Sequence, residues 1–106
     1  MAHPFYHARS SAKKFGGVWQ DYLAIHEFMD HTKAFIPDAR HRLLLHNAWG
    51  IFIAERVFGT VITRASDGKV IPLRPIVEQH ILEDFGGRIP TLEACWGELP
   101  LYDWAV

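Results

Sequence analysis

Apolar residues between Pro37 and Gly59 recur around nearly the whole circumference of a helix. Asp38 is a favourable N-cap at the start of this segment, and Gly59 is a typical C-terminal stop. A helix that is apolar on all sides is normally buried, so the pattern predicts a central helix over 38–58. The core members expected from this pattern are Leu44, Ala48, Ile51 and Phe52, with Ile25, Phe28 and Ile81 packed near them.

Shorter amphipathic segments flank the central helix along the chain. Apolar stripes with helical spacing, bounded by Pro, Asp or Gly, predict helices over 3–15, 20–36 and 75–85 and a last helical turn over 89–96. Asp21 is the expected N-cap of the second of these helices.

A change of period after the central helix predicts strands. The runs 60–63 and 70–73 are apolar and β-branched, and Ser66-Asp67-Gly68-Lys69 between them is a typical turn. Pro72 cannot donate to a ladder, which places its strand at an edge. The chain is therefore expected to form a single domain over 1–106 of the α+β class. It should be mainly α, a compact helical domain with a buried central helix and one β-hairpin at about 60–74.

Histidines and carboxylates on the helical faces are the first candidate functional residues. His26 and Asp30 lie four residues apart, with Lys33 on the same face, and His41 projects onto the apolar stripe of the central helix. A histidine on a core face must be paired, hydrogen-bonded, metal-bound or facing a cavity. The alternative for the His26 face is an ordinary surface ion-pair ladder.

The short connection at Pro37 makes the helices on either side antiparallel neighbours, which brings His26 and Asp30 towards His41. The candidate metal ligands are His26, Asp30, His41 and His80, and then His7; His46, Glu55, Glu78 and Asp84 are further polar candidates. Imidazole and carboxylate ligands together suit zinc, iron, nickel or manganese. Without a metal, Asp30 would hold a histidine tautomer, or the histidines would satisfy one another and backbone carbonyls.

Arg40 and Arg42 stand in the first turn of the predicted central helix, where the helix dipole disfavours cations. Something anionic should offset them. The sequence leaves open whether this is a carboxylate from another segment or a bound anion.

Composition narrows the classes of protein. Hydrophobic residues make up 49% of the 106 residues and charged residues 22%, which is typical of a globular protein. The net charge of −1 argues against bulk nucleic-acid binding. No apolar run approaches the roughly 18 residues of a spanning helix, so no membrane segment is expected. The single Cys95 cannot form an intrachain disulfide or a cysteine zinc cluster, which fits a cytoplasmic location.

Several blocks together resemble a small, uncharacterised family of bacterial and phage proteins of about this length. The matching blocks are HPFYHARSS, DYLAIHEFMDHTK, RHRLLLHNAWGIFIAERVFG, DGKVIPLR and EQHILEDFGGRIPT. The resemblance covers nearly the whole chain and implies a stand-alone domain of unknown function, without an assigned reaction. Candidate residues within the blocks include Ser10, Lys33 and all the histidines and carboxylates named above as candidate ligands.

Three classes of function remain open. Four Trp, seven Phe and three Tyr favour an interaction or assembly module, either a homo-oligomer or a binder of a phage or host protein. Trp104 in the apolar tail would then cover a core edge or a partner. The alternative is a divalent-metal-binding, hydrolase-like protein with a His/carboxylate cluster between helices. A metal-independent nuclease using His, Arg and Glu is the third class, and the net charge counts against it.

Overall fold

The computed structural model describes residues 3–96. The α-helices in this part are α1 (Pro4–Phe15), α2 (Leu23–Met29), α3 (Arg42–Leu45), α4 (Ala48–Phe58), α5 (Arg74–Asp84) and α6 (Leu92–Trp96). Single 3-10 turns lie at Trp19–Asp21, His31–Ala34 and Ala39–His41, and the strands are β1 (Val61–Thr63) and β2 (Val70–Pro72). The predicted α+β class, mainly α, is confirmed.

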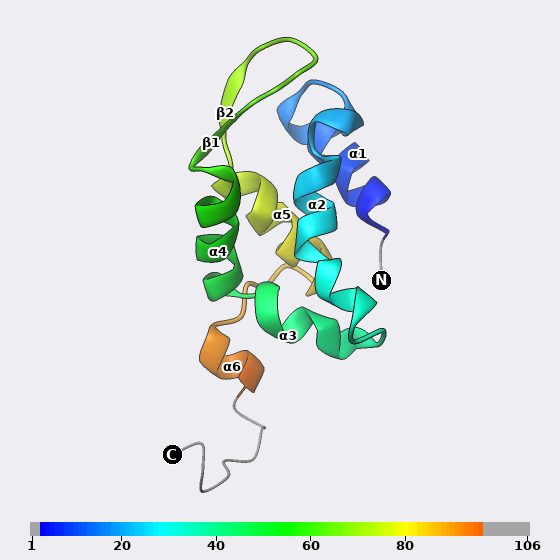
Figure 1. Cartoon of the computed structure of the whole chain (residues 1–106), viewed down its shortest axis with the longest axis vertical. Coiled ribbons are helices and arrows are strands. Elements are labelled where there is room, and N and C mark those ends of the chain that lie inside the picture. The colour runs from blue at the N-terminus through cyan, green and yellow to red at the C-terminus, as the bar shows by residue number, and fades with distance from the viewer. Residues whose placement is uncertain (1–2, 97–106) are drawn as a thin grey trace, which may run out of the picture.

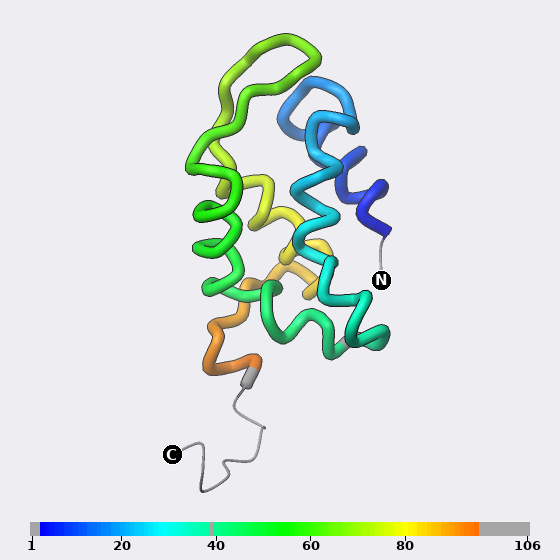
Figure 2. Tube along the Cα trace, viewed as in Figure 1, coloured from blue at the N-terminus to red at the C-terminus, as the bar shows by residue number. Residues whose placement is uncertain are grey.

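Helix α5 is the element on which the other long helices pack. It contacts α1, α2 and α4, and Figure 1 shows it between α4 on one side and α1 and α2 on the other. The Cα trace in Figure 2 shows α5, in yellow, in the same place between α4 and the pair α1 and α2. Ile76, Val77 and Ile81 of α5 are fully buried, so the core lies around this helix.

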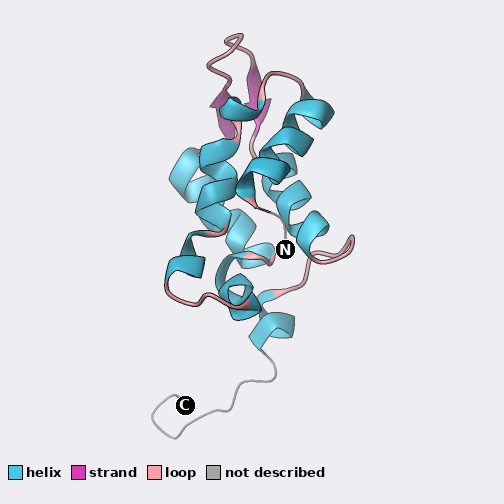
Figure 3. Ribbon diagram, turned by 90° about the vertical axis from the view of Figure 1, so that its right-hand side faces the viewer, coloured by secondary structure: helices cyan, strands magenta, loops and turns pink. Residues whose placement is uncertain are grey.

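The hairpin lies at one end of the helical bundle, as Figure 3 shows. Its strands pair antiparallel with Ile62 opposite Ile71. A two-stranded hairpin is only marginally stable alone. Arg64 connects this one to α1, because its buried guanidinium donates to the Phe15 carbonyl at 2.8 Å, while Asp67 in the turn holds the same guanidinium at 2.6 Å.

The predicted central helix over 38–58 is wrong in its continuity. It is interrupted at Asn47, whose extended backbone (φ −156°, ψ 179°) separates α3 from α4. The Asn47 amide caps both ends of this break, since Nδ2 donates to the Leu43 carbonyl at 3.0 Å and Oδ1 accepts the Gly50 N–H at 3.0 Å. These hydrogen bonds replace those that a continuous helix would form. Asp38 caps the segment as expected, accepting the Arg40 N–H at 2.9 Å.

The break also changes which residues are buried. Because the helical phase restarts at α4, Phe52 is 48% exposed, and Leu44 and Ala48 are exposed as well, contrary to prediction. Ile51 is buried as expected. Of the residues predicted beside them, Ile25 and Ile81 are buried and Phe28 is half-buried against the core.

The predicted helix over 20–36 is also interrupted. Helix α2 ends at Met29, and Asp30 follows as its C-cap. Asp21 does not cap this helix; its carboxylate instead accepts from the Val18 N–H and the Ser66 hydroxyl. The helices predicted over 3–15 and 75–85 are confirmed. The prediction for Trp104 lies outside the described residues.

Across residues 3–96, no helix has the length and apolar character needed to cross a membrane.

Candidate metal centre

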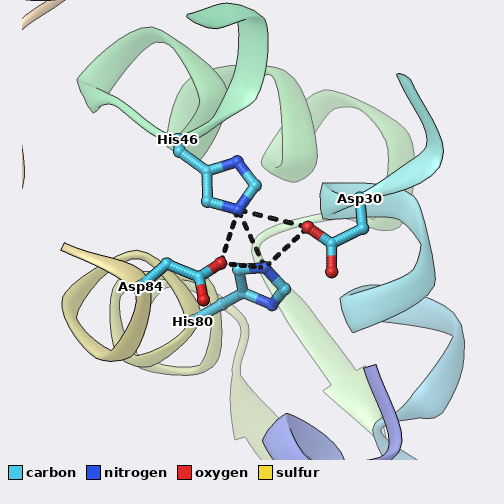
Figure 4. A group of neighbouring side chains, drawn as sticks. All are labelled: Asp30, His46, His80 and Asp84. Carbon is cyan, nitrogen blue, oxygen red and sulfur yellow. Dashed lines mark hydrogen bonds and ion pairs between the residues drawn. The ribbon is translucent and has the colours of Figure 1, made fainter. Parts of the chain in front are cut away.

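Four side chains from separate parts of the fold converge on one buried point (Figure 4). Asp30 comes from the end of α2, His46 from the break between α3 and α4, and His80 and Asp84 from successive turns of α5. The side chains of all four are at most 5% exposed. The centre therefore depends on the two interruptions that the sequence pattern did not predict.

The spacing of the four donor atoms suits a metal ion. His46 Nε2 lies 2.9 Å from Asp84 Oδ2 and 3.3 Å from Asp30 Oδ1. His80 Nε2 lies 3.3 Å from each of these two oxygens and 3.0 Å from His46 Nε2. Ligands about 2.0–2.1 Å from a tetrahedral zinc ion are about 3.3 Å apart, so these separations fit a four-ligand shell.

Gln79 fixes the direction of a hydrogen-bond chain behind the centre. Its amide nitrogen donates to the His7 carbonyl at 3.1 Å and to Glu83 at 2.8 Å, and both of these groups only accept. The amide oxygen of Gln79 must therefore face Ser11, whose hydroxyl donates to it at 2.5 Å.

That chain determines the tautomer of His80. Because the Ser11 hydrogen is already used, Ser11 Oγ accepts from His26 Nε2 at 2.7 Å. His26 Nδ1 is then an acceptor, and it accepts from His80 Nδ1 at 2.9 Å. A neutral His80 consequently has no hydrogen on Nε2, and its lone pair points towards Asp30 and Asp84. That lone pair also lies 3.0 Å from His46 Nε2, so its partner is either the His46 N–H or a cation bound between it and the two carboxylates.

His41 presents a second bare nitrogen to the centre. Its Nδ1 donates to the Asp38 carbonyl at 2.8 Å, so the neutral ring has an unprotonated Nε2. That nitrogen is fully buried, lies 3.5 Å from Asp30 Oδ1, and has no hydrogen-bond partner among residues 3–96. His41 could therefore extend the ligand shell beyond four.

His7 of α1 contacts the residues around the centre. Its Nδ1 lies 2.7 Å from Glu83, which also accepts from Ser10 at 2.5 Å, and its Nε2 lies 3.3 Å from Asp84 Oδ1. Its ring stacks on His80 with centroids 3.9 Å apart. His7 thus contacts the second oxygen of a carboxylate whose first oxygen faces the centre.

The pKa shifts of the residues at the centre show that the two buried carboxylates favour a positive charge beside them. Burial raises the pKa of Asp30 and Asp84, but hydrogen bonds from His46, and from His80 when its ring is protonated, outweigh it, and both pKa values fall well below the usual range. Burial lowers the pKa of His46, but bonding to the two carboxylates raises it above the ordinary value. His26 behaves differently: burial and the neighbouring histidines lower its pKa to about 2, so its ring stays neutral.

The structure brings together most of the residues that the sequence suggested, in altered roles. Asp30 and His80 face the centre directly, His41 and His7 contact its carboxylates, and His26 lies behind His80. His46 and Asp84, predicted only as further polar residues, complete the four. The spacing of His80 and Asp84, four residues apart on one helix, was a usable signal for Asp84.

Other candidates lie away from the centre. Glu55 pairs with Arg74 at 3.1 Å on the surface, and Lys33 is exposed. Glu78 is half-buried on α5 and does not belong to the group of converging ligands found within 3–96. Arg40 pairs with Asp38, whereas Arg42 reaches Asp84, its Nη2 3.6 Å from Oδ1.

Comparison with known proteins gives the family and no assigned chemistry. Neither a search of curated proteins nor a search of solved structures found a match to this chain. The model of the domain of unknown function DUF6915 matches residues 2–105, so the chain belongs to that family.

Proposed function

We propose that the protein binds one divalent metal ion through Asp30, His46, His80 and Asp84. The observation that supports this most directly is the hydrogen-bond chain from Gln79, which leaves a neutral His80 with a bare Nε2 pointing at two carboxylate oxygens. A metal-ligating histidine characteristically donates the N–H of its other ring nitrogen to a fixed acceptor, as His80 Nδ1 does to His26. The donor set suits zinc, iron, nickel or manganese.

The number of ligands bears on what the metal would do. A tetrahedral zinc ion with four protein ligands is closed, as in structural sites. A metal with five or six ligands keeps positions for water, which it could activate for hydrolysis. We infer a hydrolase-like centre of this second kind, in which a six-coordinate metal held by the four ligands and by His41 Nε2, the bare nitrogen beside Asp30, would keep one position for water.

Thermal unfolding as a function of pH tests the metal proposal. Protons on His46 and His7, whose pKa values are raised in the fold, stabilise the metal-free protein below about pH 6.5, and this contribution is lost as the pH rises through the raised values. The metal-free Tm should therefore fall between about pH 6 and 8. Zinc competes with those protons, so the zinc-induced rise in Tm should grow over the same interval.

Saturating zinc near pH 8 should raise Tm by more than about 10 °C, since ligand at about 1,000 times Kd adds about 4 kcal/mol. Magnesium, which prefers all-oxygen shells, is the control and should have little effect. A zinc effect that is equal at both pH values, or no larger than that of magnesium, would contradict binding to the imidazoles.

A second candidate, an assembly module, is favoured by the exposed face of α4. Trp49, Phe52 and Val57 are each more than 40% exposed there, and the rings of Trp49 and Phe52 are 5.5 Å apart. Arg56, the cation on this face, lies over the Phe52 ring. An aromatic face whose arginine is stacked on one of its own rings can pack against the same face of a second copy. We therefore propose that the partner is a second copy of this chain and that the two form a homodimer.

Sedimentation equilibrium tests the homodimer. The wild-type chain should sediment as a dimer, and Phe52→Ser should shift it to monomer while leaving the helical circular dichroism unchanged, because Phe52 is not a core residue. The exposed residue Val18 lies on a different segment, so Val18→Ser is the matched control. A wild-type chain that is monomeric throughout would exclude this assembly.

A further inference from the structure

A pocket of about 350 Å³ lies beside the candidate metal centre. Two arginines, Arg40 and Arg42, line it. The rest of its wall is mainly apolar and consists of Leu43, Phe85, Pro90, Ala94 and Cys95. Two of these residues also contact the centre. Arg42 approaches Asp84, and the Phe85 ring lies 6.1 Å from the His46 ring. A ligand in the pocket would therefore lie next to the metal ligands.

Arg42 has unused hydrogen-bonding capacity. A guanidinium carries five N–H donors. The one hydrogen bond it makes within residues 3–96 runs from Nη1 to the Asp84 carbonyl and is long, at 3.4 Å. Its Nε is buried without a hydrogen-bond partner in that part of the chain. The guanidinium lies over the Phe85 ring, 5.6 Å from its centroid.

Arg40 supplies a second positive charge to the same pocket. Its side chain is 74% exposed, and Asp38 holds it through contacts of 2.8 to 3.1 Å from Nε and Nη2. A helix dipole does not act on the two arginines as the sequence suggested, because α3 has only four residues. The two arginines instead share the lining of one pocket, where each already contacts a carboxylate, Asp38 or Asp84.

We propose that this pocket binds a small organic phosphate, with the phosphate at Arg42 and an apolar body against Leu43 and Phe85. Two guanidinium groups match the several oxygens of a phosphate better than a single carboxylate. The apolar walls account for the organic part of the ligand. The inference rests on the proposed function in one respect: it makes organic phosphates the ligand class of the metal centre.

Cys95 provides a built-in reporter for this pocket. It is the only cysteine of the chain, it lines the pocket and it is half-buried. We would measure its rate of reaction with the neutral reagent 4,4′-dithiodipyridine, in protein freed of metal with a chelator. Phenyl phosphate should slow the reaction in a saturable way. Phenol, benzoate and inorganic phosphate should each protect only at higher concentration, because each lacks one part of the ligand.

Variants assign the protection to the arginines. Arg42→Gln should raise the phenyl phosphate concentration needed for half-protection about tenfold or more, since it removes charge-assisted hydrogen bonds. Arg40→Gln should raise it by a smaller factor, and the exposed Arg40 side chain makes this change harmless to folding. Arg9→Gln on α1, whose exposed side chain lies over the Phe5 ring, is the matched control and should change nothing. Equal protection in wild type and both pocket variants would overturn the proposal, as would benzoate protecting as well as phenyl phosphate.

Elemental analysis of the same chains, after the chelator has been removed and zinc has been supplied by dialysis, separates this inference from the metal proposal. Protection by phenyl phosphate in a chain that takes up no metal would leave the pocket standing and overturn the centre. Stoichiometric metal in a chain whose Cys95 is not protected would overturn the pocket and leave the centre standing.

Discussion

Asp84→Asn is expected to reduce bound metal from about one ion per chain to nearly none. The substitution keeps the size of the side chain but removes the charge on Oδ2, which lies 2.9 Å from His46 Nε2 and 3.3 Å from His80 Nε2. Loss of an outer-shell partner alone costs about 10–100-fold in metal affinity, so loss of a ligand charge should cost more than about 100-fold. Elemental analysis after dialysis against limiting zinc measures the effect.

Glu78→Gln is the matched control for Asp84→Asn. Glu78 lies on the same helix, is half-buried, and is outside the group of converging ligands found in the described part of the chain. It should bind zinc like the wild type. If Asp84→Asn and Glu78→Gln retained the same amount of zinc, Asp84 would not be a ligand.

Gly50→Ala is expected to destabilise the fold by about 3 kcal/mol or more, a large loss of stability for the addition of one methyl group. A Cβ at this position would stand 1.7 Å from the Leu45 carbonyl oxygen and 2.3 Å from the carbonyl carbon. Both atoms belong to the backbone, so no side-chain rotation can relieve the overlap. The turn between α3 and α4 would have to move, and His46 with it.

Urea denaturation, at a protein concentration where the chain is monomeric, measures the loss, with Trp49→Ala as the control. Trp49 lies one residue before Gly50 but is 44% exposed, so its truncation should cost about 1 kcal/mol or less. Zinc uptake by Gly50→Ala should fall as well, because the same turn carries His46 into the centre. A variant as stable as the Trp49 control would show that the turn accommodates a methyl group.

The sequence predicted local structure well where the signals are local. The Pro4 and Pro75 helix starts, the stop at Gly59 and the hairpin turn at Gly68 all depend on the conformational limits of single residues. The interruption at Asn47 was missed, because its flanking apolar pattern reads as one continuous helix and the two caps depend on a single amide. The errors in predicted burial follow from this missed interruption, because the residue at which α4 begins determines which of its faces is buried.

The candidate site was predictable in part for the same reason. Helical spacing placed His26 beside Asp30, and chain direction brought both towards His41. Spacing pairs Asp84 with His80 on one helix face but does not show that this face meets Asp30, so Asp84 could be named only as one polar residue among several. The position of His46 in the centre required the interruption itself. The identity of any metal stays a prediction, because the donor set fits several ions.

The candidate centre joins parts of the chain that are far apart in sequence, since Asp30 and His80 are separated by 50 residues. Closing a loop of that length has an entropic cost that must be met before the contact is formed. The donors are therefore expected to assemble late in folding, after α2 and α5 have docked, and an ion bound there would act as a cross-link in a chain that has one cysteine. Release of the ion would then require the helices to separate, so its dissociation rate and the slowest amide hydrogen exchange of α5 should report the same opening event.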